Sequence, residues 1–178
     1  AAYLNILLTL LAFIHGSLVL RDVMAGGPTL LTFPWLDVAD LNLEISFSLS
    51  LTNVSALELI TGLSFFSQLY SLGYLDKEWA LARFFALLGF FEGAMSGVVL
   101  SDSLFQSYFL LEMLTLSTYL LVGFWYAQPL VVTAARDAFL TKRVGDVMLL
   151  MGMVALATWS GVTSFDDLYA WSATETIS

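Results

Sequence analysis

Glu112 stands inside an apolar run that covers residues 104–126. About 20 residues, each adding 1.5 Å, are enough to cross a membrane, so the run predicts a spanning helix. A carboxylate in such a helix is costly and usually faces protein, water or another charge on an ion pathway. Burial favours the neutral acid and a nearby cation favours the carboxylate, which makes Glu112 a candidate proton carrier. The pattern leaves open the alternative that Glu112 is permanently neutral or paired and only joins helices.

A second group of charges stands near the start of the following apolar segment. Lys142, Arg143 and Asp146 are spaced so that they share one face of a helix. Because a lone charge in the apolar layer is costly, Arg143 is expected to pair with Asp146. The group is interpreted as a salt bridge, a water-filled entrance or a charge that biases Glu112. The predicted proton path therefore consists of Glu112, Asp146, Arg143 and Lys142.

Glu92, Glu58 and His15 are secondary candidates, each in an apolar stretch. The two glutamates are interpreted as further relay sites or as hydrogen-bonded packing residues, with packing slightly favoured. Histidine is a common proton carrier in proteins, so His15 could serve in a proton relay. We favour instead a packed histidine that is hydrogen-bonded to a neighbouring helix.

The composition is that of a membrane protein that crosses the bilayer several times. Of 178 residues, 59% are hydrophobic and 12% are charged, and the mean hydropathy is +0.86. A soluble domain has about a quarter charged residues. The sequence has no cysteine, which excludes disulfides, thiolate metal sites and cysteine-held iron–sulfur clusters. The single histidine argues against bis-histidine haem and multi-histidine metal sites, so no cofactor or metal is expected in this chain.

The hydropathy pattern predicts an all-α transmembrane helix bundle that forms a single membrane domain over residues 1–178. An acidic loop at residues 21–46 is expected to face the lumen. Its segment LNLEISF alternates apolar and polar residues, which favours a short β-hairpin or an extended segment at the surface. The chain begins without Met or a basic signal region, so we expect it to start inside a larger protein. The five predicted helices cover residues 3–20, 47–74, 82–100, 104–126 and 132–157.

The charges predict how the chain is oriented. Cytoplasmic loops of membrane proteins carry an excess of Lys and Arg. Five basic residues lie at or near the turns 75–82 and 127–136, whereas Arg21 alone lies on the other side, among many carboxylates. These turns are therefore predicted to be cytoplasmic, with the acidic loop and the tail in the lumen or periplasm. The five basic residues are Lys77, Arg83, Arg136, Lys142 and Arg143.

Five blocks of this sequence carry a family resemblance: ARFFA (82–86), LE (111–112), TYLLVGFW (118–125), AF (138–139) and RVGD (143–146). With them the sequence resembles the antiporter-like subunits of respiratory complex I, most closely the NdhF type of the photosynthetic NAD(P)H dehydrogenase-like complex. The similarity covers residues 47–153 well and the first helix loosely. It implies a partial subunit that lacks the family's first helix and everything after the sixth. It implies no redox centre in this chain, with plastoquinone and iron–sulfur clusters elsewhere in the complex.

The resemblance also implies roles for single residues. Glu112 matches a fifth-helix glutamate that pairs with a lysine on a broken seventh helix, and Arg143 and Asp146 match a sixth-helix motif near the proton path. The implied function is proton translocation within a complex of other membrane subunits, especially a neighbouring antiporter-like subunit, in the lipid bilayer. Two positions depart from the family: Ser50 and Gln68 stand where members often carry aspartate and histidine.

One branch of the family is especially similar, the form specialised for inducible carbon dioxide uptake in cyanobacterial complexes. Glu92 in the block FFEG fits this branch, because ordinary forms tend to have an apolar residue there. The resemblance implies a location in the thylakoid membrane and a carbonic-anhydrase-like partner protein. It implies no nucleic acid as a binding partner. The alternatives are a monovalent cation/proton antiporter subunit, with the same ancestry and buried charges, and a purely structural membrane scaffold.

Overall fold

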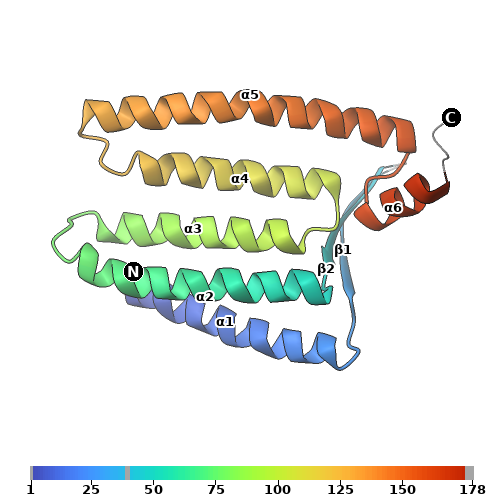
Figure 1. Ribbon diagram of the computed structural model, residues 1–178, viewed down its shortest axis with the longest axis horizontal. Coiled ribbons are helices and arrows are strands. Elements are labelled where there is room, and N and C mark those ends of the chain that lie inside the picture. Colours follow the sequence, from blue (N-terminus) through green and yellow to red (C-terminus); the bar gives the residue numbers. More distant parts are fainter. Residues whose placement is uncertain (1, 39–40, 175–178) are drawn as a thin grey trace.

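The computed structural model describes residues 2–38 and 41–174. Five long helices lie side by side in a row, with a β-hairpin and a short sixth helix at one end (Figure 1). Neighbouring helices along the chain pack against each other, and α1 also contacts α3. The elements are α1 (Ala2–Met24), β1 (Leu30–Val38), β2 (Leu41–Ser48), α2 (Leu51–Tyr74), α3 (Leu81–Leu100), α4 (Leu104–Val122), α5 (Pro129–Ser160) and α6 (Phe165–Thr174).

The all-α membrane fold is confirmed, and a helix forms at each of the five predicted positions. α4 ends at Val122, four residues earlier than expected. α5 begins at Pro129, because proline is tolerated in the first turn of a helix. It runs to Ser160 and stops at Gly161, whose φ of 75° is the left-handed conformation that ends many helices. The short helix α6 was not predicted.

Large apolar side chains cover the outward faces of the helices, and few apolar side chains are buried between them. Soluble monomers rarely expose contiguous apolar patches of this kind. Among the described residues, α1, α3 and α4 are long and apolar enough to cross a membrane. That α2 and α5 also span it remains a prediction. Exposed apolar residues include Leu7, Leu59, Leu63, Phe66, Leu140, Met148 and Met151.

The β-hairpin of β1 and β2 confirms the prediction for the LNLEISF segment. The turn between α3 and α4 joins this hairpin to the α5–α6 connection. The amide of Asp102 donates to the Ser46 carbonyl at 3.1 Å, and the Asp102 carbonyl accepts from the Phe165 amide at 3.0 Å. The amide of Leu104 donates to the Thr163 carbonyl at 2.9 Å. These bonds hold together three segments that are far apart in the sequence.

We call this part of the bundle the hairpin end. The opposite end, which we call the basic end, carries Lys77, Arg83 and Arg136, where α2 turns into α3 and α4 turns into α5 (Figure 1).

Candidate functional site

Glu112 on α4 forms an ion pair with Arg143 on α5. Arg143 Nη1 donates to Glu112 Oε2, and the Tyr108 hydroxyl donates to Glu112 Oε1 at 2.7 Å. The Glu112 side chain is 18% exposed and the Arg143 side chain is 40% exposed. Both carboxylate oxygens are therefore engaged, one of them by a charge-assisted bond. The Glu112 carboxyl group therefore connects Tyr108 on its own helix with Arg143 on the neighbouring helix.

Local helix geometry positions both partners of Glu112. Tyr108 precedes it by one helical turn on α4, so the two side chains share a face. On α5, the guanidinium carbon of Arg143 lies 4.9 Å from the ring centroid of Phe139, one turn earlier in the same helix. The face of an aromatic ring attracts a cation. The Phe139 ring in turn packs against the Tyr119 ring of α4, with centroids 4.9 Å apart.

Asp146 is buried on α5, with 5% of the residue exposed. The expected ion pair between Arg143 and Asp146 is wrong, because Arg143 reaches across to Glu112 on α4 instead. Among the residues that the structure describes, Asp146 Oδ2 has no hydrogen-bond partner. A buried polar atom without a partner is costly. As a buried ionisable residue in a predicted spanning helix, Asp146 stays a candidate for the proton path.

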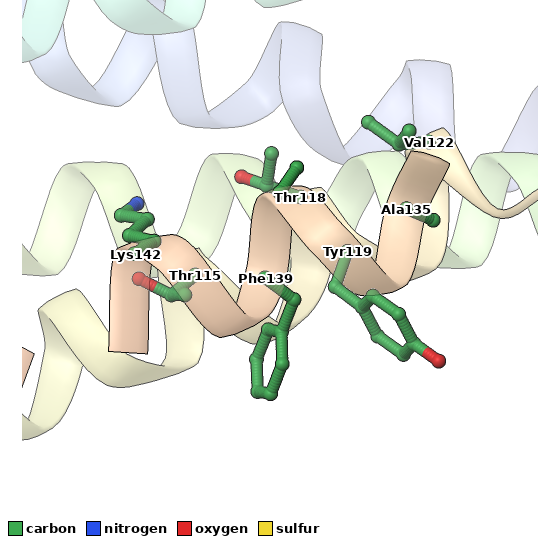
Figure 2. A pocket seen from close by; sticks show the side chains of 8 residues that line it. Thr115, Thr118, Tyr119, Val122, Ala135, Phe139 and Lys142 are labelled. Atoms are coloured by element: carbon green, nitrogen blue, oxygen red, sulfur yellow. The ribbon is translucent and has the colours of Figure 1, made fainter. Parts of the chain in front are cut away.

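Lys142 lies apart from this ion pair. It is exposed and forms no ion pair within the described part of the chain. It lines a cavity of about 90 Å³ between α4 and α5. Figure 2 shows Lys142 at one end of this cavity, with Thr115 and Phe139 between it and Tyr119. Lys142 was predicted to form one group with Arg143 and Asp146, but within the described residues it forms no ion pair with Asp146.

Glu92 belongs to a second polar cluster, between α1, α2 and α3. Its Oε2 accepts from the Thr9 hydroxyl at 2.8 Å and from Gln68 Nε2 at 3.0 Å. Gln68 Nε2 also donates to the Thr9 hydroxyl at 2.7 Å, and Asn5 Nδ2 donates to Gln68 Oε1 at 3.1 Å. Glu92 is 7% exposed and Gln68 is 0% exposed. The network joins three helices, which fits the interpretation of Glu92 as a hydrogen-bonded packing residue.

Close helix contact makes this network fit. A Cβ atom at Gly89 of α3 would lie 2.5 Å from Asn5 Oδ1 of α1. Any larger residue at Gly89 would therefore displace Asn5. Small residues at helix interfaces allow such an approach in membranes.

Glu58 on α2 faces α1 at a separate place. Its Oε1 accepts from the Ser17 hydroxyl, and its Oε2 is buried without a partner among the described side chains. A Cβ atom at Gly16 would lie 2.6 Å from Glu58 Oε2, so glycine leaves room for this carboxyl group.

His15 is exposed, and its ring makes no hydrogen bond within the described residues. Packing of His15 against a neighbouring helix of this chain was the wrong expectation. The residue lies on an outward face of α1, among the apolar side chains described above.

Comparison with known proteins places these residues in a family. One family model, described as NADH-ubiquinone oxidoreductase (complex I), chain 5 N-terminus, matches residues 35–85, and another, NADH:quinone oxidoreductase/Mrp antiporter, TM, matches residues 101–177. NAD(P)H-quinone oxidoreductase subunit 5, organellar chromatophore 2, of Paulinella chromatophora is 74% identical over 178 residues. The chain belongs to the antiporter-like subunits of complex I. The similarity spans 99% of this chain and 29% of the Paulinella relative, so the chain corresponds to less than a third of that protein.

A more distant sequence relative and two solved structures are also similar to this chain. The chloroplastic subunit 5 of Chara vulgaris is 36% identical over 145 residues, 82% of this chain and 22% of that protein. The archaeal membrane-bound sulfane sulfur reductase contains a chain with a TM-score of 0.79 and 14% identity, matched over 94% of this chain and 34% of its own length. A chain of the Mrp complex from Dietzia sp. DQ12-45-1b has a TM-score of 0.72 and 17% identity. The match covers 94% of this chain and 20% of that chain. At such identities the structures show a shared fold.

In this antiporter-like subunit, sequence reasoning identified the charged residues but missed most of their uncharged partners. Tyr108 was missed, although its spacing of one helical turn from Glu112 was a usable signal. Asn5, Thr9 and Ser17 carried no signal beyond being polar residues in an apolar helix. The two departures from the family have structural roles here: Gln68 lies in the Glu92 network, and Ser50 caps α2 by accepting from the Asn53 amide at 3.2 Å.

Proposed function

We propose that this antiporter-like subunit carries protons across a membrane as part of a photosynthetic, complex I-like NAD(P)H–quinone oxidoreductase. The observation that carries the proposal is the Glu112–Arg143 ion pair between α4 and α5, with the Tyr108 hydroxyl on the second oxygen. The names of the Paulinella and Chara relatives, both NAD(P)H-quinone oxidoreductase subunits, support it. The redox chemistry, with plastoquinone and iron–sulfur clusters, belongs to other subunits.

In the proposed mechanism, Arg143 controls the charge of Glu112. With Arg143 bound, Glu112 accepts two hydrogen bonds. When Arg143 moves away, a largely buried carboxylate loses its cation, and taking up a proton becomes favourable. Asp146, whose buried Oδ2 lacks a partner in the described structure, is the next acceptor on α5. Quinone reduction elsewhere in the complex supplies the energy that moves Arg143.

The test is proton translocation by the assembled complex in sealed membrane vesicles, with reductant and quinone supplied. We expect quinone reduction to acidify the vesicle interior in a sodium-free medium. Redox turnover without proton movement, in vesicles shown to be tight, would contradict the proposal.

We further propose the form specialised for inducible carbon dioxide uptake, in the thylakoid membrane, with a carbonic-anhydrase-like partner. The supporting observation is the buried Glu92, which Thr9 and Gln68 hold by hydrogen bonds. The complex purified from cells grown at low carbon dioxide should contain such a partner, as identified by mass spectrometry. Two results together would contradict this finer assignment: the partner is absent from the complex, and the expression of this subunit does not respond to carbon dioxide.

A monovalent cation/proton antiporter is the second candidate. It is favoured by the match of residues 101–177 to the model that includes Mrp antiporters, and by the fold shared with the Mrp complex. Transport that requires sodium, measured in the same vesicles, would select this function over the first.

A further inference from the structure

Arg83 is held in a fixed position at the basic end of the bundle. Its guanidinium carbon lies 4.8 Å from the ring centroid of Phe124 and 4.8 Å from that of Tyr126. Its Nη2 also donates to the Phe124 carbonyl. Within the described part of the chain no carboxylate forms an ion pair with Arg83. A positioned guanidinium with further free donors is therefore available to an anion.

A cavity of about 460 Å³ opens beside this guanidinium, between α3, α4 and α5. Arg83 is the only charged residue that lines it among the described residues, and the aliphatic part of the wall is formed by Leu87, Leu120, Val132 and Ala135. Tyr119 and Ala135 also line the smaller cavity of Figure 2, so the two hollows adjoin along the seam of α4 and α5. The combined shape is a largely apolar groove, with Arg83 lining the larger hollow and Lys142 lining the smaller one.

The surrounding residues place the mouth of this groove at the depth of lipid headgroups. Trp125 and Tyr126 are exposed beside it, and such aromatic residues are enriched at membrane–water interfaces. Glu78 is a carboxylate near these two aromatic residues, and it accepts a hydrogen bond from Trp125 Nε1 at 3.2 Å. At the mouth of the groove, the Arg83 guanidinium can therefore bind a lipid headgroup. The nearby carboxylate of Glu78 is already hydrogen-bonded to Trp125.

We propose that this groove binds one anionic phospholipid, with the headgroup phosphate on Arg83 and the upper part of an acyl chain between Leu87, Leu120 and Val132. Guanidinium groups bind phosphate oxygens through two donors at once. Basic pockets between membrane helices bind anionic headgroups in this way. A lipid with a quaternary ammonium group would bind more weakly, because among the residues that the structure describes no carboxylate lines the cavity to receive that cation.

The test uses the full-length subunit in its assembled complex, with photoreactive phosphatidylglycerol that carries a diazirine on the acyl chain. Cross-linked peptides are mapped by mass spectrometry and normalised to assembled complex. We expect labelling of the α4–α5 segment 119–135 that competes with unlabelled phosphatidylglycerol. Millimolar inorganic phosphate should not compete, since it lacks the acyl chain. The same probe with a phosphatidylcholine headgroup should label weakly.

Two variants and a matched control keep the test decisive. Arg83→Gln should lower the labelling about five-fold, which corresponds to the loss of one basic group near a headgroup. Val132→Trp retains Arg83 but fills the groove, and it should also lower the labelling. Lys77→Gln, a charge loss at the same end outside the cavity, should leave it unchanged. Three results would each overturn the proposal. The first is equal labelling in all three variants, and the second is equal labelling by the phosphatidylcholine probe. The third is no labelling at all, because other protein segments cover the groove.

Discussion

Arg143 of α5 pairs with Glu112 of α4, although Asp146 stands three residues away from Arg143 on its own helix. The pair therefore links two helices, and it leaves the buried Asp146 with an oxygen that lacks a partner in the described structure. An ion pair between helices changes when the helices shift, whereas a pair within one helix would not. In this geometry, motion between α4 and α5 would make or break the contact between Glu112 and Arg143.

A double-mutant cycle should therefore show coupling between Arg143 and Glu112. We expect Arg143→Gln and Glu112→Gln to couple by about 0.5–3 kcal/mol in the thermal stability of the assembled complex, as contacting residues do. Arg143→Gln and Asp146→Asn should couple less, because these side chains form no ion pair. A larger coupling for Arg143 with Asp146 than with Glu112 would contradict the structure.

Tyr108→Phe should slow proton-coupled activity without loss of assembly. The change removes only the hydroxyl that donates to Glu112 Oε1. Hydrogen bonds to charged groups contribute about 1.5–3 kcal/mol, so we expect a loss of about tenfold in the rate of proton translocation. Tyr119→Phe is the matched control on the same helix, because its hydroxyl does not bond Glu112. Equal rates for both variants would show that the Tyr108 hydroxyl has no role in the proton path.

The hairpin end should loosen as pH rises, through Asp102. Burial raises the pKa of Asp102, the nearby Asp166 and Asp167 add to the rise, and the hydrogen bond from Ser164 at 3.2 Å opposes it. The folded state thus binds this proton more tightly than the unfolded chain does. The stabilisation is fully present below the ordinary aspartate pKa of about 3.9 and is lost as pH rises through the raised value.

Hydrogen exchange of the α6 amides, corrected for intrinsic rates, measures this effect. Protection should fall from about pH 4 toward neutral pH in the natural sequence. It should depend less on pH in Asp102→Asn, whereas Asp76→Asn at the basic end should behave like the natural sequence. An unchanged pH slope in Asp102→Asn would exclude Asp102 as the titrating group.

Site-directed labelling tests the predicted orientation, in which the turns 75–82 and 127–136 are cytoplasmic. The sequence has no cysteine, so a single cysteine placed at Lys77 or at Asp37 is the only thiol in this sequence that a reagent can label. An impermeant thiol reagent should reach the two positions from opposite sides of the membrane. Labelling of both from one side would refute the topology of five spanning helices.

Hydropathy alone was sufficient to predict the five long helices, because their apolar faces must meet lipid or one another. The hairpin followed from the alternation in LNLEISF. In contrast, α6 lies in the polar stretch FDDLYAWSAT, whose weak pattern resembles a loop. Its place depends on bonds with the distant Asp102, which no local pattern encodes.

The candidate site was predictable as a set of residues but not as a set of contacts. A charge in an apolar run marks Glu112, Asp146 and Arg143 as costly and therefore as candidates. Which carboxylate Arg143 selects depends on how α4 and α5 face each other. The same limit explains the error about His15, because a helix pattern does not show which face its neighbours cover.

Proton translocation by the complex with Glu112→Gln, compared with Glu92→Gln, tests the central claim most directly. The change at Glu112 removes the carboxylate that pairs with Arg143, whereas Glu92 bonds only uncharged partners in the described structure. At equal assembly we expect Glu112→Gln to lower the translocation rate on the order of a hundredfold, the scale of a lost proton-transfer group, and Glu92→Gln to lower it much less. Full activity in Glu112→Gln would support a structural scaffold, and an equal loss in both variants would contradict the role assigned to the Glu112–Arg143 pair.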